Sequence, residues 1–153
     1  MYRSIQLCLK LALILFIVNG CSGKRSDDIG IGSSGLRSCP KSPNCVSSEA
    51  NDEQHAIESF RLKGDPNASW PLIQDEIVSM PRWVIVTATD NCIHVECKSR
   101  IFRFIDDLEL CFNSSNGIIS IRSASRIGYS DFGANRRRVE LLRSELRAKQ
   151  VIE

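Results

Sequence analysis

The sequence predicts an α+β domain: a four-stranded antiparallel sheet flanked by an N-terminal and a C-terminal helix. Residues 83–123 hold four segments rich in β-forming residues with turn residues between them. Apolar residues with the period of a helix come before and after these segments. They are Trp70, Ile73 and Ile77 on the N-terminal side, and Val139, Leu142 and Leu146 on the C-terminal side.

The first helix is expected to begin near Asn67 or Ser69, either of which can cap its first turn, and to end at Pro81. Residues 83–89 (WVIVTAT) follow as the first strand, because β-branched and aromatic side chains favour extended backbone. Asp-Asn at 90–91 is a typical turn and closes this strand.

Residues 92–98 and 102–112 are the second and third strands, since apolar and polar side chains alternate along both. A turn at 99–100 would place Glu96 opposite Arg103 and Val95 opposite Phe104, which matches polar with polar and apolar with apolar. In this register Asp106 lies on the apolar face and Asp107 on the polar face.

The same register separates three cysteines. Cys97 is expected to face the core, Cys111 to face away from it, and Cys92 to lie opposite Asp107. Because Cys92 is then several residues from Cys111, we expect no disulfide among the three.

Asn116-Gly117 predicts a hairpin into the fourth strand at 118–123. The final helix is expected to run from Asn135, as its cap, to about Gln150, with Arg143 and Arg147 facing outward.

The N-terminus has the layout of a secretory signal. Two cations in residues 1–10 precede the apolar run 11–18 (LALILFIV), which is too short to span a bilayer permanently. Residues 18–21 (VNGC) resemble the bacterial lipobox, which implies cleavage before Cys21 and attachment of lipid to it. We therefore expect a signal peptide at 1–20, a lipidated Cys21 with a flexible tether to residue 38, and one domain at 39–153.

This layout places the protein in the cell envelope, facing the periplasm and held to the membrane by its lipid. Ser22 after the lipidated cysteine favours the outer membrane over the inner one, by similarity to bacterial lipoproteins. The formal charge of +2 comes from Arg3 and Lys10 in the leader, so bulk charge gives no argument for nucleic-acid binding.

Cys39 and Cys45 are the natural disulfide pair of an oxidising compartment, because two prolines stiffen the short loop between them. A zinc site is the alternative, but the spacing is poor and the chain has only two histidines. We expect neither a metal nor another cofactor.

Two motifs resemble one family, the bacterial and plastid proteins grouped as domain of unknown function 1499. They are CPKSPNCVSS at 39–48 and RSASRIGYSDFGAN at 122–135, the second followed by Arg138, and FIDD at 104–107 also matches. The similarity covers about residues 39–150. It departs at Glu58-Ser59, where family members more often continue into proline. The resemblance supports the domain and implies no activity.

The segment 122–138 is rich in arginine and serine and precedes a helix N-terminus, which suits an anionic group such as a lipid headgroup or a glycan phosphate. The alternative, which we favour, is an ion-pair network: a carboxylate on the apolar face needs a partner, which Arg126 or another loop arginine supplies, and Asp131 could pair likewise. The candidate residues for both are Asp106, Arg122, Ser125, Arg126, Asp131, Asn135 and Arg138.

The sequence thus predicts a lipid-anchored envelope protein with a structural or anion-binding accessory role. An envelope hydrolase that uses the acidic and arginine residues of this loop is the second hypothesis, although no catalytic motif is evident.

Overall fold

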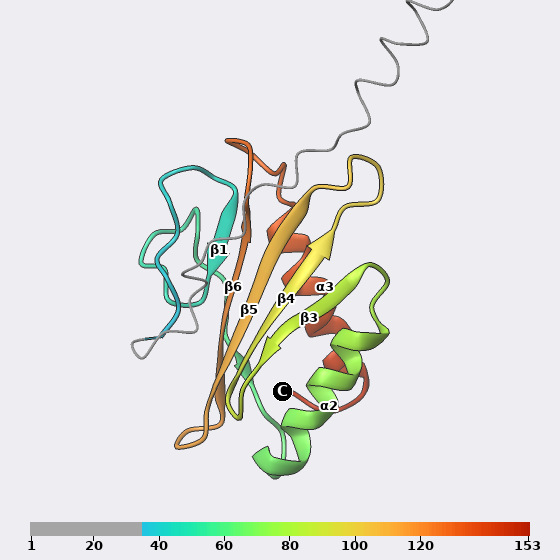
Figure 1. The fold of residues 1–153 in the computed structure, drawn as a ribbon. Coiled ribbons are helices and arrows are strands. Elements are labelled where there is room, and N and C mark those ends of the chain that lie inside the picture. The colour runs from blue at the N-terminus through green and yellow to red at the C-terminus, as the bar shows by residue number, and fades with distance from the viewer. Residues whose placement is uncertain (1–34) are drawn as a thin grey trace, which may run out of the picture.

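The computed structural model describes residues 35–153, so the expectations for the leader and for Cys21 lie outside the described residues. Six strands form one antiparallel sheet in the order β1-β6-β5-β4-β3, and β2 also pairs with β6 (Figure 1). The elements are β1 (Cys45–Ser47), β2 (Phe60–Arg61), α2 (Pro66–Ser79), β3 (Trp83–Ala88), β4 (Cys92–Lys98), β5 (Ile105–Asn113), β6 (Ile118–Ser125) and α3 (Ala134–Ala148). The α+β class is as predicted, but the sheet has two strands more than the four expected.

Both helices pack on the same face of the sheet (Figure 1), where they bury its apolar side chains. The centre of this core consists of fully buried residues from the helices and the strands: Ile73, Ile77, Ile93, Val95, Leu108, Leu110, Ile119, Ile121, Val139, Leu142 and Leu146. Within residues 35–153, no helix is long and apolar enough to cross a membrane.

The first turn of α2 is capped by Asp65, not by Asn67 or Ser69. The Asp65 carboxylate accepts the backbone N–H of Asn67 at 3.0 Å, and Pro66 occupies the first helical position, where no N–H is needed. The cap therefore lies two residues before the nearer position that the sequence suggested.

The start of α3 also differs from the prediction. Gly133 precedes the helix with a φ of +77°, and Asp131 accepts the backbone N–H groups of Gly133 and Asn135 at 2.9 and 2.7 Å. Asn135 is thus not the cap but a buried residue of the first turn. Arg143, expected to face outward, is buried: its guanidinium lies 4.6 Å above the Phe60 ring.

The register between β4 and β5 differs from the prediction by four residues. Glu96 lies opposite Asp107 and Val95 opposite Leu108, rather than opposite Arg103 and Phe104. The cause is the connection, because a loop at 99–104 replaces the short turn expected at 99–100. The faces remain as predicted because four is an even number.

This register overturns the expectation for the cysteines. Cys92 lies directly opposite Cys111, with 4.2 Å between their Cα atoms, and the two form a disulfide. The structure also contains the Cys39–Cys45 disulfide. Cys97 remains a thiol in the core, and burial raises its pKa to about 12.

Candidate functional site: two charged networks on opposite faces of the sheet

Asp106 and Arg138 form an ion pair on the helix side of the sheet. Both side chains are about nine-tenths buried, and the Arg138 guanidinium, which comes from α3, reaches the carboxylate at the start of β5. Asp106 faces this side because β5 alternates regularly and its neighbours Leu108 and Leu110 point into the core. Arg138 therefore neutralises a carboxylate that the strand pattern forces towards the apolar layer.

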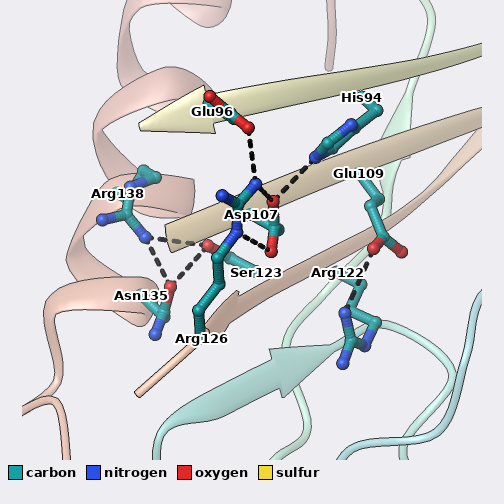
Figure 2. Close-up of polar contacts among 9 residues, drawn as sticks. All are labelled: His94, Glu96, Asp107, Glu109, Arg122, Ser123, Arg126, Asn135 and Arg138. Carbon is teal, nitrogen blue, oxygen red and sulfur yellow. Dashed lines mark hydrogen bonds and ion pairs between the residues drawn. The ribbon is translucent and has the colours of Figure 1, made fainter. Parts of the chain in front are cut away.

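Asn135 links this ion pair to two other segments. Its Oδ1 accepts from the Ser123 hydroxyl at 2.7 Å and from Arg138 (Figure 2). Its Nδ2 donates to the Asn44 carbonyl at 2.9 Å and to Ser125 Oγ at 3.0 Å. Asn135 is fully buried. We call this group, together with Asp106, the helix-side network.

A second network occupies the other face of the sheet, around Asp107 (Figure 2). Arg126 binds this carboxylate with two donors, Nε to Oδ2 at 2.9 Å and Nη2 to Oδ1 at 2.6 Å, and Nη2 also donates to Glu96 at 2.7 Å. Nε2 of His94 lies 2.8 Å from Asp107 Oδ1. These four residues form the open-face network, a name that refers to the face without helices.

The charges of this network reinforce one another. Burial alone would raise the pKa of Asp107, but hydrogen bonds from His94 and Arg126 outweigh burial and hold that pKa below its usual range. The hydrogen bond to Asp107 in turn raises the pKa of Arg126 above its usual value. The result is a fixed ion pair between Arg126 and Asp107, not a pair of groups that exchange a proton near neutral pH.

Glu109 and Arg122 form a looser pair on the same face. Arg122 Nη1 donates to Glu109 Oε1 at 3.2 Å, while the other Glu109 oxygen and Arg122 Nε are buried without a hydrogen-bond partner among the described residues. Burial raises the pKa of Glu109, although Arg122 and His94 oppose that effect. Among the described residues, Glu109 is therefore the one carboxylate of the sheet with a buried oxygen that accepts no hydrogen bond.

The structure thus separates the seven candidate residues of the sequence. Asp106, Ser125, Asn135 and Arg138 come together on the helix side, whereas Arg122 and Arg126 lie on the other face. Asp131 belongs to neither network, because both its oxygens accept backbone N–H groups at the start of α3. The expected pairing of Asp131 with an arginine is therefore wrong.

Sequence reasoning missed three polar residues on the face without helices, two in the open-face network and Glu109. His94, Glu96 and Glu109 alternate with apolar residues, and this pattern indicates a polar face exposed to solvent, yet His94 and Glu109 are 2% and 1% exposed. The sequence did contain a signal for these residues: Arg122 and Arg126 need acidic partners on one face of the sheet.

The arrangement leaves little room for ligand chemistry at the arginines. A cavity of about 260 Å³ is lined by residues 36–39, 47 and 49–52, and its lining includes none of Arg122, Arg126 and Arg138. Among residues 35–153, no group of histidine, cysteine, aspartate and glutamate is arranged to hold a metal ion.

The fold and these networks define a small α+β domain with one antiparallel sheet, two helices on one face and ion pairs buried on both faces. The chain belongs to the family of proteins of unknown function DUF1499, whose sequence model matches residues 35–146. A comparison with curated proteins finds no significant match.

Proposed function

We propose that the protein is a lipid-anchored accessory of the cell envelope and that its arginine networks are structural rather than ligand-binding. The observation that carries this proposal is that Arg122, Arg126 and Arg138 each donate to a buried carboxylate of the sheet. An anionic ligand at these arginines would compete with a carboxylate that is already in place and already desolvated. A structural role needs no such exchange.

The contacts also indicate what the networks hold in place. Arg126 follows β6 and ties its end to β4 and β5, while Asn135 and Arg138 tie α3 to β5, β6 and the segment before β1. The family motif at 122–135 is therefore explained by the attachment of one loop and one helix to both faces of the sheet.

The anchor is the second part of the proposal, and its support is the lipobox-like sequence VNGC at 18–21. Two disulfides in the domain fit an oxidising compartment, as a protein exported to the periplasm would encounter. We do not extend the proposal to hydrolysis, because Asp131 caps a helix and Arg126 is held between two carboxylates.

Lipid attachment can be tested with labelled palmitate in a bacterial host. The wild-type chain is expected to incorporate label and to stay with membranes after a high-salt wash, whereas Cys21→Ser removes both properties. Cys8→Ser is the matched control, because Cys8 lies in the segment that cleavage removes. Equal labelling of the wild type and Cys21→Ser would overturn the anchor.

The structural role of the networks has a separate test. Titration of the domain with inorganic phosphate is expected to give no saturable heat of binding. Saturable binding that Arg126→Ala abolishes, with the fold retained by circular dichroism, would show that the open-face network is a ligand site and would contradict the structural interpretation.

A further inference from the structure

Two loops leave the sheet at the same end. Lys98 pairs with Ile105 and Asp106 with Ser125, so the β4–β5 loop and the segment after β6 start from neighbouring rows of the sheet. Figure 1 shows both loops at the upper end of the molecule, where α3 begins. We call the exposed residues of these loops the cation–aromatic end: Arg100, Ile101, Phe102, Arg103, Phe104, Tyr129 and Phe132.

This end exposes large apolar side chains that the core does not use. Ile101, Phe102 and Phe132 are 79%, 68% and 88% exposed, and Tyr129 is 74% exposed. The rings of Phe102 and Phe104 stack on each other at 5.5 Å between centroids, outside the core. Single exposed apolar residues are ordinary, but five on two adjacent loop tips are typical of a surface that contacts another protein, a ligand or a membrane.

The charges of the β4–β5 loop at this end have one sign. The loop Lys98-Ser-Arg-Ile-Phe-Arg-Phe104 carries three cations and no acid. Arg100 and Arg103 are exposed, and neither forms an ion pair within residues 35–153. The one acid of segment 127–133, Asp131, is occupied by backbone N–H groups of α3. The end therefore presents aromatic rings between cations.

We propose that the cation–aromatic end binds the surface of an anionic lipid bilayer. Aromatic side chains are stable at the level of the headgroups, and arginines beside them bind lipid phosphates. Charge complementarity favours this occupant, because the bilayer surface is negative and the β4–β5 loop carries three cations and no acid. Two narrow loop tips also suit insertion between headgroups better than they suit a protein interface, which requires a broad packed core.

Binding through this end would orient the domain on the membrane to which the proposed lipid anchor holds it. This binding depends on the two loops, whereas the anchor depends on Cys21. Thirteen residues lie between Cys21 and Gly35, where the described structure begins, and the fourteen residue-to-residue steps reach at most about 50 Å. An anchored domain can therefore bring this end to the same bilayer. Binding by the domain alone is weak, and the anchor raises the effective concentration of the surface.

The test uses the chain from residue 21 with Cys21→Ser, exported to the periplasm so that both disulfides form. All buried hydrophobic residues of the described structure lie between Leu36 and Ile152, so this chain keeps the whole core. Co-flotation with vesicles of phosphatidylcholine and phosphatidylglycerol is expected, with much weaker binding to pure phosphatidylcholine and a decrease as salt is added.

Arg100→Glu with Arg103→Glu is expected to weaken binding to the anionic vesicles by at least about 25-fold, from roughly a fivefold effect for each of the two cations. Phe102→Ser with Phe132→Ser is expected to weaken it on the order of tenfold or more. The matched controls are Lys63→Glu, an exposed cation at the opposite end of the sheet, and Leu72→Ser with Leu141→Ser on the helices. All controls are expected to bind as the parent chain does.

Three results would overturn the proposal: no flotation of the parent chain at low salt, equal binding to neutral vesicles, or equal loss in the controls and in the loop variants. Because this chain cannot be lipidated, failure here leaves the palmitate test unaffected, and failure of labelling leaves this test unaffected. The loop variants change exposed side chains only, so circular dichroism is expected to show the parent fold in each.

Discussion

Substitution of Arg138 by methionine is expected to lower the free energy of unfolding by about 3–5 kcal/mol, the range for a buried ion pair that loses one partner. The side chains of Arg138 and Asp106 are 10% and 8% exposed, so the variant leaves a buried carboxylate without its counter-charge. Arg138 also donates to Ser123 Oγ at 2.9 Å and to Asn135. Loss of these bonds places the expected cost in the upper part of the range.

The pair is best measured as a double-mutant cycle in urea, followed by circular dichroism. Asp106→Leu alone is expected to destabilise the domain similarly, because it isolates the Arg138 cation. The double variant is expected to cost at least about 2 kcal/mol less than the sum of the single variants, since no charge is left unpaired. Arg137→Met, at an exposed neighbour in α3, is the control and is expected to stay within about 0.5 kcal/mol of wild type. Additive costs, or equal costs for Arg137→Met and Arg138→Met, would refute the reasoning.

The remaining predictions concern the disulfide, the buried amide and acid stability. Cys92→Ser with Cys111→Ser is expected to lower the free energy of unfolding by about 3 kcal/mol. The buried Cys97 thiol is expected to react with an alkylating reagent only after denaturation, as measured by intact mass. Asn135→Ala is expected to cost about 2–4 kcal/mol in urea unfolding, because it leaves four partners, two of them buried, short of a hydrogen bond. Since the pKa of Asp107 is lower in the folded state, its contribution is present above the ordinary aspartate value of about 3.9 and is lost as pH falls through the folded pKa. Urea midpoints measured against pH are therefore expected to fall less steeply with acid for Asp107→Asn, and an unchanged slope would contradict the assignment.

The strands that sequence reasoning located correctly are those with a long pattern. Residues 92–98 alternate without interruption, and β4 has these bounds in the structure. β1 and β2, with three and two residues, are too short to show a period, and they exist because β6 offers them a free edge. The register between β4 and β5 could not be deduced, because it depends on a loop whose length the alternation does not encode.

For the candidate site, the sequence predicted which residue needs a partner but not which residue supplies it. The position of Asp106 among apolar neighbours showed that it needs a partner, but the partner comes from α3, 32 residues later, and its identity depends on how the helix packs. The acceptors of Arg126 lay in a pattern that indicates solvent exposure. Alternation distinguishes two faces of a strand, but it does not tell which polar face becomes buried.

The pair Asp106-Asp107 constrains the register of β5 in the sheet. One carboxylate meets an arginine of α3 and the other meets Arg126 on the opposite face, so a slip of β5 by a single position would turn each away from its cation. Such a misaligned sheet would hold two buried charges without partners, as well as apolar side chains facing the wrong way. A dipeptide that anchors both layers at once therefore discriminates against off-by-one assembly more strongly than the apolar pattern of the strand does alone.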